Sequence, residues 1–406
     1  MNHMPPKMMP FEEALTFFQT CLPTLVEKET VPLASALGKV LAEDIVSPIN
    51  VPPAANSAMD GYALNIDQAS EHADTKQTPF QVSQRIPAGH APSPLVTGTV
   101  ARIFTGAEIP LGANAVIMQE EVRVNSDDTI SLLRLPSANE NIRPKGQDVA
   151  SGQSILHSGQ HLNAMDIGLL ASIGINRVTI FKPLQVGILT TGDELIAPGT
   201  PLQDGQIYNS NGPMLQGLLT QSGYQVIDVT HCLDDKAATE SALQNLANKV
   251  DIILSSGGVS VGEEDYVKDA IERNGTINLW KVAMKPGKPI VIAKVFNTPL
   301  IGLPGNPSST LVTYHWLANA ALKRASGQAI QRPKPIPVKA SFSRNKTISR
   351  DEFLRVSIQN GQAKPHPQQS SGALLPACES DGYLHIPAGF EINQEDSYDF
   401  YPFSTF

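Results

Sequence analysis

The stretch that decides the fold is Ser255-Ser256-Gly257-Gly258-Val259-Ser260-Val261-Gly262-Glu263-Glu264-Asp265. It follows the apolar run 250–254, which predicts a buried strand, and it precedes residues 266–273, which predict the start of a helix. A strand, a glycine turn and a helix N-terminus in this order favour anion binding, because bare N–H groups and the helix dipole both attract negative charge. Gly257 and Gly258 let an anion approach the main chain, and Asp265 adds a carboxylate suited to a metal ion or a proton transfer.

Composition narrows the class of protein. A chain of 406 residues is expected to form several domains, and its net charge of -9 argues against a general nucleic-acid binder. Cys21, Cys232 and Cys378 are far apart, which supports neither a disulfide framework nor a zinc ribbon. The first residues lack the apolar core of a signal peptide, and no apolar run approaches the length of a membrane span. We therefore expect a cytoplasmic protein with no membrane or nucleic-acid partner.

Residues 183–327 alternate between strand-like and helix-like segments. Strands are expected at 184–190, 226–229, 252–254, 289–295 and 300–303, with helices at 213–221, 236–248, 265–273 and 307–325. This alternation predicts a doubly wound, mostly parallel βα domain.

The flanking segments have a different character. Helical spacing predicts helices at 10–20, 32–43 and 155–173, whereas short β-prone runs between Gly and Pro turns at 51–135 predict a small inserted β module. The proline-rich segment 332–337 predicts a stiff linker, and 338–406 predicts a small β-barrel. The expected fold is a multi-domain α/β chain with a doubly wound domain, an inserted β module, a discontinuous helical or extended domain and a C-terminal β-barrel.

Loops that follow predicted strands carry the polar motifs of the βα domain. They are Thr191-Gly192-Asp193-Glu194, the turn at Gly257-Gly258, and Pro304-Gly305-Asn306-Pro307-Ser308. Each alone is explained by a turn or a helix cap, with Asn306 as cap and Pro307 as first helical residue. Their shared position at one sheet edge favours a common ligand site, because ligands of open α/β sheets bind there.

Further charged motifs surround these loops. Lys281, Lys285 and Lys288 lie around a Pro-Gly turn that is either a solvated loop or an electropositive pocket for oxyanions. Asp60 and Asp148 lie in turn-like segments whose ordinary explanation is a tight turn. The chain shows no HExxH, GxSxG or Walker lysine motif, and its only histidines at helical metal-ligand spacing are His157 and His161, which more often mark a wet surface.

Taken in order, the motifs resemble the molybdopterin molybdenumtransferase family, to which the gephyrin E domain belongs. The segments that carry the resemblance are 56–63, 104–107, 143–148, 191–195, 256–262 with Asp265, 285–289 and 303–307. The resemblance implies that molybdate and adenylylated molybdopterin are converted to molybdenum cofactor and AMP, with a divalent cation such as Mg²⁺. It also implies an elongated homodimer with composite active sites and a possible contact with the preceding adenylyltransferase.

The resemblance and the chemistry together assign roles to residues. Glu194 and Asp265 are candidate metal ligands. Asp60 and Asp148 could accept hydrogen bonds from the edge of the pterin ring. These four residues are the candidate catalytic carboxylates. Substrate and oxyanion binding falls to a larger set: Thr105, Gly257, Gly258, Ser260, Lys281, Lys285, Lys288, Pro304, Asn306, Pro307, Ser308 and, from the C-terminal barrel, Arg355 and Ser371.

The implied domains are 1–48 with 140–177, 49–139, 178–328 and 338–406. A receptor-binding scaffold of the gephyrin E type is one alternative, although a scaffold need not keep the whole carboxylate and lysine set. The molybdopterin adenylyltransferase is another, although its fold would cover only residues 183–327.

Overall fold

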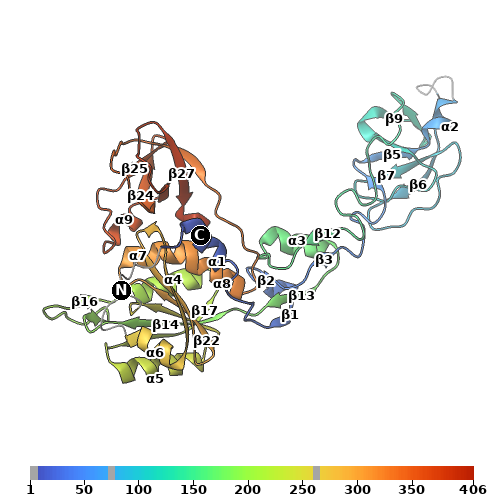
Figure 1. The fold of residues 1–406 in the computed structure, drawn as a ribbon. Coiled ribbons are helices and arrows are strands. Elements are labelled where there is room, and N and C mark those ends of the chain that lie inside the picture. The colour runs from blue at the N-terminus through green and yellow to red at the C-terminus, as the bar shows by residue number, and fades with distance from the viewer. Residues whose placement is uncertain (1–7, 72–77, 259–265) are drawn as a thin grey trace.

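The computed structural model describes residues 8–71, 78–258 and 266–406, which form an elongated molecule (Figure 1). An α/β domain and a β-barrel lie together at one end, and a small β module lies at the other. A narrow segment around β13 and β12 connects the two ends.

The α/β domain is built on a six-stranded sheet in the order β17-β14-β18-β22-β21-β19. Neighbouring residues of its strands belong to different cores: Ile188 packs on one face and Leu189 on the other. Because successive side chains of a strand point to opposite faces, helices on both faces are needed to cover the sheet, and the predicted doubly wound fold is confirmed. The elements are β14 (Gln185–Thr191), α4 (Asn211–Gln221), β17 (Gln225–Cys232), α5 (Lys236–Ala247), β18 (Ile252–Ser256), α6 (Tyr266–Asn274), β19 (Gly275–Lys281), β21 (Pro289–Val295) and β22 (Thr298–Leu303).

Several details of this domain were not predicted. Strand β19 was missed, and β21 pairs antiparallel with both β22 and β19 while the other pairs are parallel. The expected closing helix 307–325 is α7 (Pro307–Thr313), a π-helical turn Tyr314–Ala318 and α8 (Asn319–Ala325). A short excursion after β14 carries β15 (Leu195–Ile196) and β16 (Ile207–Tyr208).

The β module confirms the prediction of a small inserted β module between the helical segments. Its main sheet has the order β6-β7-β5-β8, and its apolar side chains form two small cores, one of them around Leu64 and Ile117. The elements are β4 (Asn56–Ser57), β5 (Gly61–Leu64), α2 (Ile66–Ser70), β6 (Val82–Ile86), β7 (Val100–Ile103), β8 (Ala115–Met118), β9 (Val122–Val124), β10 (Ile130–Leu132) and β11 (Ile142–Arg143).

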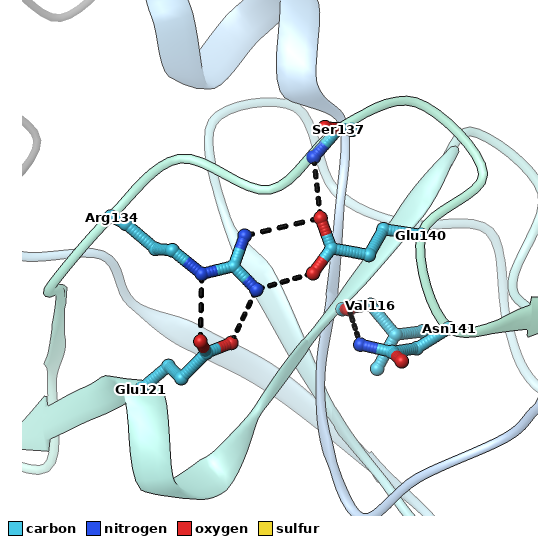
Figure 2. A network of polar contacts seen from close by, with 6 residues as sticks. All are labelled: Val116, Glu121, Arg134, Ser137, Glu140 and Asn141. Carbon is cyan, nitrogen blue, oxygen red and sulfur yellow. Dashed lines mark hydrogen bonds and ion pairs between the residues drawn. The ribbon is translucent and has the colours of Figure 1, made fainter.

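A charged cluster holds the returning chain of the module in place (Figure 2). Arg134 donates to both carboxylate oxygens of Glu121 at 2.6 and 2.7 Å, and it also pairs with Glu140. Glu140 in turn accepts from the backbone N–H of Ser137 at 2.8 Å, and these bonds lower the pKa of the Glu140 carboxyl. Because a bidentate guanidinium–carboxylate pair fixes orientation as well as distance, this cluster defines the path of residues 134–140.

The expected helix at 32–43 is wrong. The segment begins at the last residue of β1 (Lys28–Pro32) and continues through a single 3-10 turn to β2 (Val40–Leu41), and both strands pair with β13 (Arg177–Phe181). Leu37 is 62% exposed, and Gly38 has a φ of 72°. That left-handed backbone ends any helix at this point, so the helical spacing was accidental.

The expected helix at 155–173 is right only in its second half. Residues 154–156 form β12, which pairs with β3 (Ile45–Val46), and α3 covers only Ala164–Ser172. Asn163 accepts from the N–H groups of Met165 and Asp166, while Asp166 accepts from the Asn163 N–H. This capping box starts the helix nine residues later than periodicity indicated.

The C-terminal strands close into a barrel, as predicted. The order β24-β25-β23-β27-β26 is closed by pairing of β26 with β24. The elements are β23 (Ile336–Ala340), β24 (Asp351–Gln359), β25 (Gln362–Pro365), α9 (Leu375–Cys378), β26 (Gly382–Ile386) and β27 (Ser397–Pro402). A short strand of the α/β domain, β20 (Met284–Lys285), adds in parallel to β24 and joins the two domains.

Helix α1 (Phe11–Phe18) confirms the prediction for residues 10–20. Phe11 packs edge-on against Trp316 and Phe353, so the helix belongs to the core shared by the α/β domain and the barrel. Across the described ranges, none of the helices combines the length and the hydropathy that a bilayer crossing needs.

Candidate active site

The predicted loops meet at the carboxyl ends of β14, β18 and β22. These strands are adjacent and parallel, so the segments after Thr191, Ser256 and Leu303 emerge side by side. They line a cleft of about 1030 Å³ whose wall includes Gly192, Glu194, Gly258 and Asn306. The predicted convergence of the motifs on one sheet edge is thus present in the structure.

The lysine loop reaches the same edge because β21 runs in the opposite direction. Strand β21 is antiparallel to β22, so its first residue lies beside the last residues of the parallel strands. Lys285 and Lys288 precede β21 and line a second cleft of about 680 Å³. This cleft adjoins the first, and the residues common to both walls are Gly257, Gly258, Gly305 and Asn306.

A buried amide joins three of the segments that form the first cleft. The side-chain N–H₂ of Asn211, at the start of α4, donates to the Ser256 hydroxyl at 2.8 Å and to the Gly305 carbonyl at 2.6 Å. The Ser256 hydroxyl donates onward to the Pro304 carbonyl at 3.2 Å. Asn211 is 8% exposed, so these bonds are shielded from water and fix the cleft wall.

Glycine is required at position 258. Its φ is 63°, and a Cβ there would lie 2.5 Å from the Val267 Cγ2 atom of α6. Gly257 also has a positive φ of 97°, but its N–H donates to the Leu303 carbonyl at 3.2 Å. The expectation that the Gly257 N–H serves as an anion donor is therefore not supported in this conformation, because that group already has a partner.

The two clefts differ in charge. The first has the carboxylates of Glu194 and Asp234 in its wall, whereas the second has the cations Lys285, Lys288 and Arg350 and no carboxylate among its described lining residues. Cationic donors around a small cavity suit an oxyanion, and carboxylates beside it suit a divalent cation.

The barrel supplies part of the second cleft through the loop 369–371. The Ser371 carbonyl accepts from the backbone N–H of Ser308 at 3.0 Å, and the Ser371 hydroxyl accepts from the Asn306 amide at 3.3 Å. Ser371, Pro304 and Asn306 therefore lie at the predicted site, and Pro307 lies in the wall of the first cleft.

Arg355 differs from its expected position. It is 1% exposed and lies in neither cleft wall; its guanidinium donates to the carbonyls of Phe353 at 3.5 Å and Ser370 at 3.4 Å, and burial lowers its pKa. Its backbone also exchanges hydrogen bonds with the Gln369 amide at 3.1 and 2.9 Å. Arg355 thus supports the loop that carries Ser371 from behind.

Other predicted residues are separated from the clefts. Ser308 is fully buried at the start of α7, and Lys281, at the end of β19, lies outside both cleft walls. Ser260 and Asp265 lie outside the described residues. The structure therefore brings together Glu194, the two glycines, Lys285, Lys288, the Pro304 loop and Ser371.

The carboxylates of the N-terminal half lie elsewhere in the chain. Asp60 accepts from the backbone N–H of Thr105 at 2.8 Å and from its hydroxyl at 2.7 Å, and these bonds lower the pKa of the Asp60 carboxyl. Both residues adjoin β5 and β7, which lie at the opposite end of the molecule from β14 (Figure 1). Asp148 is exposed and follows the module. Within one chain these residues do not reach the clefts.

Several cleft residues were missed by sequence reasoning. Asp234 follows the carboxyl end of β17 at Cys232, so the rule that placed the other loops could have found it. Tyr208 is the last residue of β16 and Asn211 follows that strand, and no periodic signal exists for the β15–β16 excursion. Arg350 reaches the second cleft only because β24 pairs with β20, a contact between domains that the sequence does not indicate.

Comparisons with known proteins agree with this architecture. Residues 9–174 match the MoeA N-terminal region (domain I and II), residues 187–324 match a probable molybdopterin binding domain, and residues 337–403 match the MoeA C-terminal region (domain IV). Molybdopterin molybdenumtransferase of Haemophilus influenzae is 40% identical over 86% of this chain and 85% of its own length. Molybdopterin molybdenumtransferase 2 of Mycobacterium tuberculosis is 38% identical over 88% and 90%.

A solved structure shows the same fold. The molybdopterin biosynthesis MoeA protein of Pyrococcus horikoshii superposes with a TM-score of 0.81 at 29% identity, covering 97% of this chain and all of that chain. Sequence and structure thus agree along nearly the whole length, and the chain belongs to the molybdopterin molybdenumtransferase (MoeA) family.

Proposed function

We propose that this protein transfers molybdenum from molybdate to adenylylated molybdopterin and releases molybdenum cofactor and AMP. The observation that carries the proposal is the pair of adjoining clefts, one with carboxylates and one with cations, that share the wall formed by Gly258 and Asn306. A polyanionic nucleotide-linked substrate and a tetrahedral dianion need such neighbouring sites, because each must be held close to the other against charge repulsion.

The second cleft is the proposed molybdate site. Lys285 and Lys288 offer point charges, and Arg350 offers a planar donor set to the same space. The hydroxyl groups of Ser309 and Ser371 line that space and would complete the hydrogen bonds to the oxyanion. Arg355 would act on this site only through the loop that it supports.

The first cleft is the proposed site of the phosphoanhydride and of Mg²⁺. Glu194 and Asp234 lie in its wall, and one or two carboxylates with substrate phosphates are the ligands that Mg²⁺ prefers. No group of three potential ligands occurs among the described residues, so the phosphates would have to complete the coordination, with Asp265 as a further candidate. A cation bound here would neutralise charge that develops as the anhydride is cleaved.

The remainder of the site would come from a second subunit. Asp60 and Thr105 lie at the far end of the same chain, so a homodimer in which the β module of one subunit covers the clefts of the other would bring them into contact (Figure 1). Asp60 or Asp148 would then accept from the pterin edge. Cores confined to single regions support the proposed domains 49–139, 178–328 and 338–406. Helix α1 instead packs into the larger core that the α/β domain shares with the barrel, and not with the rest of 1–48 and 140–177.

A cytoplasmic location and a contact with the enzyme that adenylylates molybdopterin complete the proposal. Three widely spaced free cysteines fit a reducing compartment. A handover contact would keep the adenylylated intermediate from hydrolysis in solution.

Incubation of the purified protein with adenylylated molybdopterin, molybdate and Mg²⁺ tests the function. We expect AMP release that depends on all three, and loss of most of it in Glu194→Gln. AMP release that proceeds equally without molybdate would contradict the transfer reaction, because the chain would then only hydrolyse the anhydride.

A further inference from the structure

A buried carboxylate stands directly behind one of the cleft lysines. Glu352, the second residue of β24, has a side chain that is 4% exposed, and its Oε1 atom lies 2.9 Å from the Lys285 Nζ atom. Its other oxygen lies 2.5 Å from a terminal nitrogen of Arg344, an ion pair by charge and distance rather than an aligned hydrogen bond. One carboxylate therefore lies between two cations, only one of which lines the cleft.

The pairing of β20 with β24 produces this arrangement. In the parallel register Lys285 is the partner of Glu352 and Met284 the partner of Asp351, and the Asp351 N–H donates to the Ala283 carbonyl at 2.9 Å. The same seam places Arg350 at the cleft, where its guanidinium donates to the Met284 carbonyl at 3.3 Å. The barrel thus contributes a cation and a counter-ion to the same cleft.

The counter-ion opposes the cleft's electropositive character. An oxyanion that contacts the Lys285 ammonium would lie on the side away from Glu352, with the ammonium between two negative groups. The buried carboxylate repels that oxyanion through a region of low dielectric, where charges act more strongly than in water. Arg344 offsets part of this repulsion because it neutralises the other carboxylate oxygen.

We propose that Glu352 is a positioning residue that holds Lys285 in the cleft and limits how tightly the cleft retains an oxyanion, with Arg344 setting the strength of that effect. The inference rests on the proposed function, which makes the oxyanion molybdate. Molybdate must leave the cleft for molybdenum transfer to proceed. A cleft with three cations therefore needs a counter-ion that keeps the bound molybdate exchangeable. The alternative is that the ion pairs only attach the barrel to the α/β domain.

Titration calorimetry with molybdate alone separates these accounts. Glu352→Gln keeps an acceptor for Lys285 and the shape of the side chain while removing the charge, and we expect molybdate to bind about tenfold more tightly, about 1.4 kcal/mol. The gain should shrink as salt is raised, because it is electrostatic. Unchanged or weaker binding in a folded variant would overturn the inference, since a purely structural attachment gives no gain in affinity.

Two variants complete the design. Glu395→Gln is the control, because it removes the same charge from the barrel far from the cleft. Glu395 contacts Gln362, which pairs with Gln359 at the opposite end of β24 from Glu352. The affinity of this variant for molybdate should equal that of the wild type. Arg344→Gln should weaken molybdate binding about threefold, because the oxyanion is then exposed to the full charge of Glu352. This variant keeps the test decisive if Glu352→Gln does not fold. Arg344→Gln with unchanged or tighter binding would overturn the inference. A wild-type protein that binds no molybdate would instead contradict the proposed function.

Discussion

Asn211→Ala is predicted to loosen the cleft and to cost about 2 kcal/mol of unfolding free energy. The wild-type amide donates to the Ser256 hydroxyl and to the Gly305 carbonyl inside the protein. Each of these bonds contributes about 1 kcal/mol net, and the Gly305 carbonyl left without this donor costs about 1 kcal/mol more. The Asn211 Oδ1 atom is buried without a partner among the described residues, so its removal returns about 1 kcal/mol.

Urea denaturation, analysed for the transition of the α/β domain, measures this change. The matched control is Asn248→Ala, in which the exposed C-cap residue of α5 is truncated, and its effect should stay within about 0.5 kcal/mol. Because Gly305 belongs to both cleft walls, Asn211→Ala should also weaken molybdate binding. A variant as stable as the control would refute the argument that this amide holds the cleft together.

Mixing Asp60→Ala subunits with Glu194→Ala subunits should restore about half of the wild-type activity per heterodimer if each active site is shared between two subunits. No recovery of activity, once exchange of subunits between dimers has been confirmed, would contradict the shared site. Burial, with a smaller effect of Lys323, lowers the pKa of His315 to about 3. Only the unfolded state therefore binds a proton here as pH falls below 6.5, so the stability of the folded state decreases. Because the ring lines a cleft, we expect a loss of about 1 kcal/mol by pH 5, and His315→Asn should remove this pH dependence in denaturation experiments. Arg355→Lys should raise the molybdate concentration needed for half-maximal rate with little change in maximal rate, since it loosens the Ser371 loop, and an equal fall in maximal rate would point to direct participation.

Most strands and helices of residues 183–327 were predictable because these elements are set by local patterns. Apolar runs such as 252–254 are long enough to be buried strands, and the loops after β14, β18 and β22 must emerge together once those strands are parallel. The helix expected at 32–43 failed for the opposite reason: Val40 and Leu41 are buried by pairing with β13, which is more than a hundred residues away in sequence. A helical period over a few turns cannot be distinguished from two short strands when the partner strand is unknown.

The arginines of the barrel show where sequence reasoning reaches its limit. Arg350 and Arg355 are five residues apart, both follow the same linker, and either could offer a guanidinium to an oxyanion. The difference between them is set by the seam with β20, which turns Arg350 toward the cleft, and by the barrel interior, which buries Arg355 behind the Ser370 carbonyl. Such a seam joins a two-residue strand of one domain to the edge of another, and two residues carry no periodicity to predict it. The chemistry of this cleft therefore depends on a contact that the sequence pattern does not reveal, since the same seam supplies Arg350 and pairs Lys285 with the counter-ion Glu352.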